Sequence, residues 1–560
     1  MTEQPHFDLR TEPWILARFP GGEVRELSLN ETFSRAHEIR DLVGEVPTQV
    51  FAITRLLLAI LHRSLPEIEK PVDDWAELWN MQTLPVELVL EYLEDEGWAD
   101  RFDLLHPEKP FYQVAGLRTS KGETSGLERL IADVPNGEPY FTTRRNGGVE
   151  TLSFAEAARW LIHAHAYDPS GIKSGAIDDN RVKGGKGYPI GTGWAGELGG
   201  ILIEGVSLRE TLLLNLVLGE TADEPLPHED YPIWERDPQT GAVEQGGSGE
   251  LRMPTGQADL FTWQSRRIRL VHDGERVSSV LIANGDQLRP QNLHVVETMT
   301  GWRRSPAQEK KLSKPLIYMP RTHDPERSFW RGLGALIPPG ARERMTSEGA
   351  ASLPPGNMHW LQTVRNRGDL GADFPLRTHA IGISYGTQSS TVDEIIDDTL
   401  AVRLVLLTEE GRALATAAED MISATEDAVY ALAQLAGNLE IAAGGQPDGA
   451  RERARERAYF ELDPEFRHWL GDLRASTVID DAQEAWTATA ERIIRQLGEQ
   501  LVEAAPPAAW IGRERSIGGH VSSSEASEWF RRSLRKAFPA PAPVLTAGTT
   551  KIESSNEEAH

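Results

Sequence analysis

The segment His379–Ser390, with the sequence HAIGISYGTQSS, holds the residues whose types and spacing most directly suggest chemistry. Its first half fits the pattern G-x-S-x-G, in which Ser384 would be the nucleophile of a serine hydrolase. Its second half suits a mechanical role, because Thr387, Gln388 and Ser389 would form a small polar tip on a tight turn that could push into a duplex. Only the first interpretation makes the chain an enzyme.

A hydrolase elbow needs a strand before the serine, a helix after it and further parallel strands around it. Ala380–Ser384 could be that strand, and His468 and His520 are the downstream histidines that precede the tail. The chain beyond residue 410 has a helical pattern, however, and cannot supply the remaining strands. The sequence therefore favours a protein without a catalytic residue and keeps the hydrolase as the alternative.

Metal and cofactor chemistry has little support in the sequence. His163 and His165 are two residues apart on a predicted helix, so their side chains point to different faces. The chain has no cysteine, which excludes disulfides, thiolate zinc sites and iron–sulfur clusters. We expect ordinary helix histidines, no metal and no cofactor.

The net charge of −27 argues against nucleic-acid binding, but the charge is unevenly distributed. Residues 252–344 carry 16 Lys and Arg against 9 Asp and Glu. This basic window is either a local polyanion site or a solvated surface. The candidate phosphate contacts are Lys183 and Lys186 in a glycine-rich turn, and Arg303 and Arg304 in the window.

The pattern along the chain predicts an α+β protein in two parts and a tail. Residues 1–408 are expected to form an irregular mixed body with small sheets and long loops, and residues 409–538 a four-helix bundle. Residues 539–560, rich in Ala and Pro and then polar, are expected to be disordered. Predicted elements include a hairpin over 14–29, a buried helix from Pro47 to Leu65, and strands over 260–271 and 277–283.

Membrane insertion and secretion are not indicated. The first 30 residues hold no apolar signal segment, and the longest apolar run, Val50–Leu61, is interrupted by Arg55 and too short to span a bilayer. We expect a cytoplasmic protein.

An ordered series of short motifs resembles one family, the large subunit (CasA) of the type I-E CRISPR surveillance complex Cascade. The resemblance covers roughly residues 7–540 and rests on the order of the motifs rather than on any single one. The motifs are Glu12-Pro-Trp-Ile-Leu16, His106-Pro-Glu-Lys-Pro-Phe-Tyr-Gln113, Gly171-Ile-Lys-Ser-Gly175, Lys183-Gly-Gly185, Tyr188-Pro-Ile190, Leu208–Asn215, Leu260-Phe-Thr-Trp-Gln264 and Tyr385–Ser390, followed by the helical bundle.

The resemblance implies a non-catalytic subunit that reads the protospacer-adjacent motif (PAM) of double-stranded target DNA from the minor groove. A glycine loop approaches the groove, and its match here is Gly171, Ile172, Lys173, Ser174 and Gly175. A glutamine wedge then starts strand separation, and its match is Gln388, flanked by Thr387 and Ser389.

Two further family features match less directly. A loop that docks on the crRNA and the complex backbone matches Phe141–Thr151, with Phe141, Arg144 and Arg145 as its contact residues. The family's lysine finger has no lysine at the corresponding region, near Asp286–Asn292, and we expect Arg289, Gln291 or Asn292 to substitute.

The implied partners are the crRNA, target DNA, a helicase–nuclease effector, and the backbone, small and crRNA-end-capping subunits of the complex. A purely structural scaffold subunit is the remaining alternative to PAM recognition.

Overall fold

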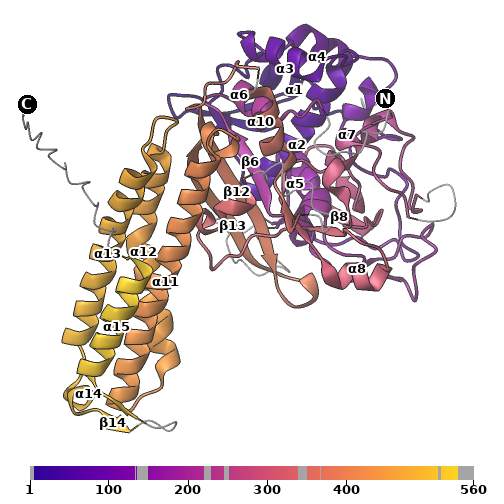
Figure 1. Cartoon of the computed structure of the whole chain (residues 1–560). Coiled ribbons are helices and arrows are strands. Elements are labelled where there is room, and N and C mark those ends of the chain that lie inside the picture. The colour runs from indigo at the N-terminus through magenta and orange to yellow at the C-terminus, as the bar shows by residue number, and fades with distance from the viewer. Residues whose placement is uncertain are drawn as a thin grey trace, which may run out of the picture. The chain divides into compact units, whose positions relative to one another are not determined.

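The computed structural model describes residues 5–132, 134, 149–219, 229–244, 251–337, 350–365, 367–514 and 519–539. The chain divides into two compact units, Met1–Ala415 with Leu470–Ser476, here called the body, and Thr416–Trp469 with Thr477–His560. The body is a mixture of helices and small sheets, and the second unit is helical (Figure 1), so the predicted α+β class is confirmed. Phe141, Arg144, Arg145 and the tail from residue 540 lie outside the described residues.

The N-terminal hairpin and the buried helix form as the sequence predicts. Strands β1 (Ile15–Arg18) and β2 (Val24–Leu27) are antiparallel, and β3 (Asp41–Leu42) adds a third strand to β1. Helix α2 (Pro47–Ser64) begins with proline at its first turn and is buried over most of its length. Shorter helices surround it: α1 (Leu29–Ser34), α3 (Pro71–Asn80), α4 (Val86–Leu93) and α5 (Phe154–Tyr167).

A three-stranded antiparallel sheet carries the motif at 379–390. Its order is β13-β12-β6, with β6 at Gly200–Glu204, β12 at Pro375–Tyr385 and β13 at Val392–Arg403. From Pro375 to Ala380 alternate residues of β12 are buried, as expected for a strand with one face on a core, whereas Ala380–Ile383 are all buried. Helix α6 (Leu208–Asn215) follows β6, and α10 (Gly356–Arg365) lies in the same part of the body (Figure 1).

A four-stranded sheet carries the glycine loop. Its order is β5-β4-β8-β7, with β4 at Lys173–Ser174, β5 at Lys186–Gly187, β7 at Arg266–His272 and β8 at Val277–Asn284. The strand predicted over 260–271 is wrong before Arg266, because α7 (Gln257–Phe261) includes Leu260 and Phe261 and residues 262–265 are neither helix nor strand. Asp230 accepts hydrogen bonds from the backbone N–H groups of Ala258 and Asp259, and these long-range contacts favour a helix start over a strand.

The remaining elements of the body are short. Strands β9 (Trp302–Arg304), β10 (Tyr318–Pro320) and β11 (Ser352–Leu353) form a small sheet in the order β10-β9-β11, flanked by α8 (Pro306–Leu312). Single 3-10 turns complete the body. They are η1 (Ala99–Phe102), η2 (Leu127–Arg129), η4 (Trp194–Glu197), η5 (Ile233–Glu235), η6 (Leu293–Val295), η7 (Phe329–Ala335), η8 (Thr387–Ser389) and η9 (Leu404–Leu407).

Four long helices run side by side in the second unit (Figure 1). They are α11 (Arg412–Ala443), α12 (Pro447–Asp472), α13 (Ile479–Glu503) and α15 (Ser523–Ala537), with a short α14 (Pro507–Ile511) and a small hairpin of β14 (Arg513–Glu514) and β15 (His520–Val521). Helix α12 continues through Pro464. Across the described residues, no helix combines the length and apolar character that crossing a membrane requires.

A buried ion pair lies at the centre of the body. Arg55 of α2 donates to both carboxylate oxygens of Glu297, each at 2.8 Å, and the two side chains are 3% and 0% exposed. Trp194 Nε1 donates to Glu297 Oε2 at 2.7 Å, and the Arg55 guanidinium lies 4.1 Å from the centre of the Phe261 ring. Segments far apart in the sequence thus meet on one carboxylate.

Replacing Glu297 by alanine should destabilise the body strongly, because the Arg55 charge would be left buried without a partner. Loss of one member of a buried pair costs about 3–5 kcal/mol. Chemical denaturation of the full chain, followed by tryptophan fluorescence, measures the effect. Glu23→Gln removes a carboxylate from the exposed pair with Arg25 and is the matched control, expected to leave the unfolding midpoint nearly unchanged. Equal midpoints for the two variants would contradict the central role of Glu297.

Candidate nucleic-acid interface

A groove of about 510 Å³ lies beside both of the main sequence-predicted features, although Thr387, Gln388 and Ser389 are not among its lining residues. One wall is Ser170 with Gly171–Ser174 of the glycine loop, and another is Ser390, Thr391 and Val392, which follow the tip of the polar turn. The rest of the lining comes from α5 and the two residues after it, from η2 and its neighbours, and from Ile282 of β8. Segments more than 200 residues apart in the sequence therefore share one concave surface, which suits an elongated ligand.

The C-terminal end of α5 holds the glycine loop in place. Asp168 follows the helix, and its buried carboxylate binds two cations, the Lys173 ammonium at 2.6 Å and the Arg266 guanidinium. Arg266 is fully buried and also donates to the carbonyl groups of Asp168, Pro169 and Gly191. Burial alone would raise the pKa of Asp168, but Lys173 and Arg266 outweigh it and lower that pKa. The cluster therefore has two cations to one carboxylate.

Lys173 of the glycine loop is not exposed, as a direct phosphate contact would be. Its side chain is only 10% exposed, and its ammonium is bound to Asp168. Burial lowers the pKa of Lys173, while the Asp168 charge acts in the opposite direction. Lys173 thus fixes the loop and contributes positive potential to the groove wall from below its surface.

Glycine is needed at Gly171 and at Gly175 for different structural reasons. Gly171 has a φ of +146°, and a Cβ atom there would meet nothing within 4 Å, so the backbone faces open space. Gly175 is buried, and a Cβ atom there would lie 2.6 Å from the carbonyl oxygen of Gly185. Gly171 is therefore the position where backbone can approach a ligand, whereas Gly175 allows the loop to pack on the neighbouring hairpin.

That neighbouring hairpin presents two cations to solvent. The backbones of Lys183 and Lys186 are paired by hydrogen bonds of 3.1 and 3.2 Å, and Gly184 and Gly185 both have positive φ values, as a tight hairpin turn requires. Both lysines are exposed. Their strand pairs with β4, so they lie beside the glycine loop and remain candidate phosphate contacts.

The polar turn lies between two long paired strands. Gln388 and Ser389 adopt left-handed backbone conformations with φ values of 56° and 53°, and Thr387 and Gln388 are exposed. Gly386 N–H donates to Thr391 O at 3.0 Å, and a Cβ atom at Gly386 would lie 2.6 Å from Asp393 Oδ1. Gly386 is thus required by close packing under the turn.

Tyr385 connects this turn to the same end of α5 that holds the glycine loop. Its hydroxyl donates to the carbonyl oxygen of Tyr167 at 2.7 Å. The ring packs so closely on Gly196 that a Cβ atom there would lie 2.4 Å from the Tyr385 hydroxyl oxygen. Sequence reasoning identified neither Tyr385 nor Asp168 as a positioning residue, because each acts through a partner distant in the sequence.

The residues that could replace the lysine finger are not equivalent. Arg289 is exposed and Gln291 is half-buried. Asn292 already has a structural role, because its Oδ1 accepts from Tyr318 N–H at 2.7 Å and its own N–H donates to Tyr318 O at 3.0 Å. Arg289 and Gln291 are thus better suited than Asn292 to contact a ligand.

Two sets of contacts fix the start of the segment near Asp286–Asn292, here called the finger segment. Asn284 Nδ2 donates to Tyr188 O at 2.6 Å, and Arg181 donates to Gly285 O at 3.0 Å, which ties the segment to the lysine hairpin. On its other side, Asp286 Oδ1 accepts from Glu244 N–H and from Arg267, both at 2.9 Å.

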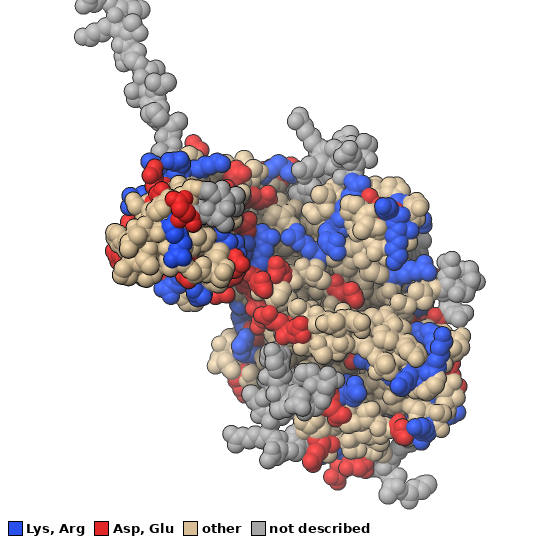
Figure 2. Space-filling model, turned by 90° about the horizontal axis from the view of Figure 1, so that it is seen from below, with Lys and Arg blue, Asp and Glu red and all other residues tan. Residues whose placement is uncertain are grey.

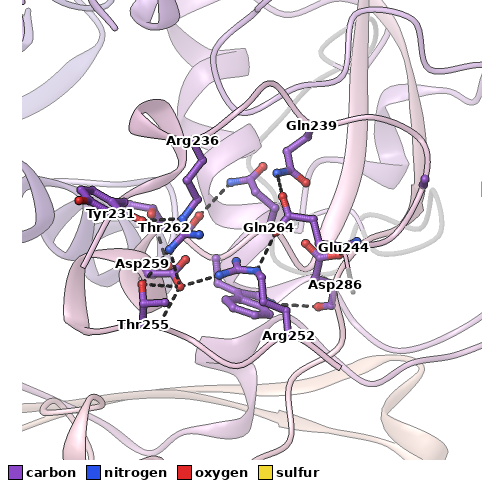
Figure 3. Close-up of polar contacts among 12 residues, drawn as sticks. Tyr231, Arg236, Gln239, Glu244, Arg252, Thr255, Asp259, Thr262, Gln264 and Asp286 are labelled. Carbon is purple, nitrogen blue, oxygen red and sulfur yellow. Dashed lines mark hydrogen bonds and ion pairs between the residues drawn. The ribbon is translucent and has the colours of Figure 1, made fainter. Parts of the chain in front are cut away.

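A polar network extends these contacts to the segment that precedes α7 (Figure 3). Arg252 lies between Glu244 and Asp259, at 2.8 and 2.6 Å, and Asp259 also pairs with Arg236. The Arg252 guanidinium lies 4.0 Å from the centre of the Trp263 ring. The described part of the acidic stretch at 229–244 is therefore anchored to the core near the finger segment.

The two basic-window candidates lie in another sheet. Arg303 and Arg304 are on β9, where Arg304 pairs with Glu309 and Arg303 is exposed beside a second pocket. Arg129 of η2, in contrast, lines the groove and is exposed, and no sequence motif marks it. On the face seen in Figure 2, basic side chains gather in separate patches among acidic and uncharged areas.

The residues considered for catalysis or metal binding occupy structural positions. Ser384 lies within β12, opposite Glu394 of β13, rather than at the strand-to-helix turn of a nucleophile elbow. His163 and His165 are buried and hydrogen-bonded to Thr48 and to the carbonyl oxygen of Tyr112, and burial lowers the pKa of each to about 3. Among the described residues, no group of three or more His, Asp or Glu side chains is placed to hold a metal ion.

Comparison with known proteins identifies the family. The family model of the CRISPR-associated protein Cse1 matches residues 8–497. The chain belongs to the Cse1 family. CasA is another name of this family, so the resemblance seen in the sequence is confirmed.

Relatives of the Cse1-family chain include proteins of known structure. The Cse1 of Thermobifida fusca is 49% identical with a TM-score of 0.87, and the alignment covers 96% of this chain and 98% of that one. The Cse1 of Acidimicrobium ferrooxidans is 30% identical with a TM-score of 0.78, over 96% and 99% of the two chains. The curated CasA/Cse1 of Thermus thermophilus is 30% identical over 62% of this chain, and the match spans 63% of that relative's length.

The sheet β13-β12-β6 of this Cse1-family chain contains a titratable histidine whose contribution to the free energy of unfolding can be measured. His379 of β12 bonds to Glu204 of β6 and Asp397 of β13 at 2.8 and 2.5 Å. Burial lowers the pKa of His379, but the two carboxylates outweigh it and raise that pKa above 6.5.

The link should therefore stabilise the protein most below pH of about 6.5, the unfolded value, and its contribution should be lost as pH rises through the raised folded pKa. The measurement is the difference in unfolding free energy between wild type and His379→Gln, followed from acidic to alkaline pH. Glu204→Gln combined with Asp397→Asn removes both partners and should abolish the dependence. A difference that grows with rising pH would contradict the assignment.

Proposed function

We propose that this Cse1-family chain is the large subunit of a type I-E CRISPR surveillance complex, that it recognises the PAM in double-stranded DNA and that it starts strand separation. The observation that carries the proposal is the groove between the glycine loop and Ser390–Val392, which directly follow the polar tip. A protein named as a CRISPR RNA-guided surveillance complex matches the fold with a TM-score of 0.63 at 19% identity. That likeness supports the architecture alone.

The geometry suits readout from the minor groove. Readout there distinguishes mainly A·T from G·C, so few side chains are needed and close backbone approach matters more. Gly171 offers exposed backbone, while Arg129 and the Lys173 cluster supply positive potential at the groove wall. Lys183 and Lys186 add exposed cations beside it, and Arg289 or Gln291 would take the place of the lysine finger.

We assign Gln388 as the wedge because it lies on an exposed turn that rigid paired strands support. Gln388 lies at the tip, and the strands behind it pair over ten residues, from Pro375 opposite Arg403 to Ser384 opposite Glu394. Inserting a side chain between base pairs costs a few kcal/mol of unstacking, so the backbone of the turn must keep its position during insertion. The β6 pairing and the Tyr385–Tyr167 hydrogen bond brace the hairpin against that load.

Replacing Gln388 by glycine should slow duplex opening more than DNA encounter. Glycine accepts the φ of 56° without strain, so this variant removes the side chain while preserving the turn. In the assembled complex, R-loop formation should slow on the order of tenfold on fully paired target DNA. A target with a pre-melted bubble next to the PAM should largely rescue the variant, because the unstacking has already occurred.

Gln388→Asn is the matched control, since it keeps an amide on a residue type that tolerates the left-handed conformation. It should fall between wild type and the glycine variant on paired DNA. Equal defects of the glycine variant on the paired and bubble targets would show that Gln388 contributes binding or folding only.

Substitution of Gly171 tests backbone approach. Gly171→Ala adds a small side chain and backbone strain, whereas Gly171→Asp adds the same strain together with negative charge beside phosphates. The aspartate variant should bind PAM-containing duplex on the order of tenfold more weakly than the alanine variant at low salt, and the gap should narrow as salt rises. Filter binding of the assembled complex provides the measurement. Identical affinities for the two variants at every salt concentration would show that the DNA does not bind beside Gly171.

We assign no catalytic role to the chain within this proposal. Ser384 lacks the elbow geometry, and its labelling by a fluorophosphonate probe would reverse that assignment. The crRNA, the other complex subunits and the helicase–nuclease are the proposed partners, in the cytoplasm. We assign assembly or recruitment to the bundle because it is a separate unit with exposed apolar side chains, among them Tyr430, Phe460 and Trp510.

A further inference from the structure

A second pocket in the body, of about 350 Å³, is distinct from the groove. It lies between β6, β9, η7 and the β12–β13 hairpin. Three arginines line it, Arg303, Arg321 and Arg327. None of the three is among the residues proposed above for PAM recognition or strand separation. The pocket therefore needs an explanation of its own.

Arg321 is the best-positioned cation of the pocket. Its backbone is fixed on both sides, because its N–H donates to Gly301 O and its carbonyl accepts from Gly199 N–H, both at 2.8 Å. Burial, together with the charge of Arg327, lowers the pKa of the Arg321 guanidinium. Within the described ranges, no carboxylate lies within ion-pair distance of Arg321.

Two carboxylates, Asp398 and Asp324, also line the pocket. Asp398 Oδ2 accepts from the Phe329 N–H at 2.9 Å and fixes the start of η7, and Asp324 Oδ1 accepts from Glu326 N–H at 3.0 Å. His323 donates from Nε2 to Gly200 O at 3.0 Å, and burial lowers its pKa, so it is neutral. Three guanidinium groups against two carboxylates leave one positive charge, which favours an anion.

The lining also selects the kind of anion. Apolar side chains of Ile201, Phe329, Leu336 and Ile396 form part of the wall, and the volume exceeds what a bare phosphate or a single carboxylate fills. A guanidinium matches phosphate oxygens with two parallel hydrogen bonds. The lining thus combines a phosphate end with an apolar end.

The pocket and the groove are built on the same hairpin. Ile396 lines the pocket and Val392 lines the groove, four residues apart on β13, or roughly 13 Å along a strand. A strand released at the hairpin tip would therefore be within reach of this pocket. That proximity favours a nucleic-acid ligand over an acidic protein segment.

We propose that this pocket binds one phosphorylated nucleoside unit, with the phosphate at Arg321, Arg303 and Arg327 and the sugar or base against Phe329 and Ile396. The unit comes either from a single strand of nucleic acid or from a free mononucleotide, and the experiment separates these two sources.

Two substitutions test the site in the full chain. Arg321→Gln removes the central cation. Gly332→Glu places a carboxylate beside it, since a Cβ atom at Gly332 would lie 4.0 Å from Arg321 Nη2 and the backbone there is not left-handed. Arg532→Gln, on the exposed face of α15, removes the same charge elsewhere and is the matched control. Thermal unfolding verifies that each variant is folded.

Fluorescence anisotropy with labelled dT10 provides the measurement. Arg321→Gln and Gly332→Glu should each weaken binding on the order of tenfold and reduce the salt slope by about 0.7, the value for one phosphate contact on a single strand. Arg532→Gln should bind like wild type. If unlabelled dTMP competes with dT10 at similar concentrations, the ligand is a free nucleotide; if it competes only weakly, the ligand is a strand.

Three results would overturn the site. Both pocket variants could bind dT10 as Arg532→Gln does, so that the strand lies elsewhere. Inorganic phosphate could compete as well as dTMP, so that the apolar wall contributes nothing. A poly-glutamate peptide could compete as well as dT10, so that the pocket takes carboxylates. Each result is independent of PAM recognition, because dT10 contains no duplex.

Discussion

The buried carboxylate of Asp168 is the interaction on which the interface depends. It lies at the end of α5 and binds Lys173 from the glycine loop and Arg266 from β7. The preceding residue, Tyr167, accepts the hydrogen bond from Tyr385 beneath the wedge. One helix end therefore positions both the loop that would approach the duplex and the turn that would open it. Because the carboxylate is ionised and enclosed by cations, the glycine loop cannot move away without leaving a buried charge unpaired.

Backbone strain marks the tip of the hairpin. Gln388 and Ser389 both have left-handed conformations that side-chain-bearing residues rarely adopt, each at a cost of about 1–2 kcal/mol. Long paired strands and the His379 link with Glu204 and Asp397 hold them there. Strain of this kind persists only where the surroundings over-determine the backbone, as they do here, and it keeps the glutamine exposed rather than folded back on the sheet.

Local charge resolves the conflict between an acidic chain and a nucleic-acid role. The groove lining has Lys173 and Arg129 against Asp168 and Glu128, with the buried Arg266 bound to Asp168 as a third cation, and the second pocket has three arginines for two carboxylates. These excesses lie in concave surfaces, where the field of a few charges is strongest. The net charge of −27 describes the rest of the surface and does not exclude such sites.

The sequence by itself determined the mixed body, the helical bundle, the hairpin at 15–27 and helix α2, because local periodicity and turn residues encode them. The roles of the glycine loop and the wedge come from the family resemblance and stay predictions. Only the tertiary structure decided that Lys173 is buried against Asp168 and that Gly175 packs against Gly185. It also decided that Asn292 is hydrogen-bonded to Tyr318 and that Arg129 lines the groove. It also ended α7 at Phe261, started β7 only at Arg266 and continued α12 through Pro464. These features depend on partners distant in the sequence, so no local pattern could specify them.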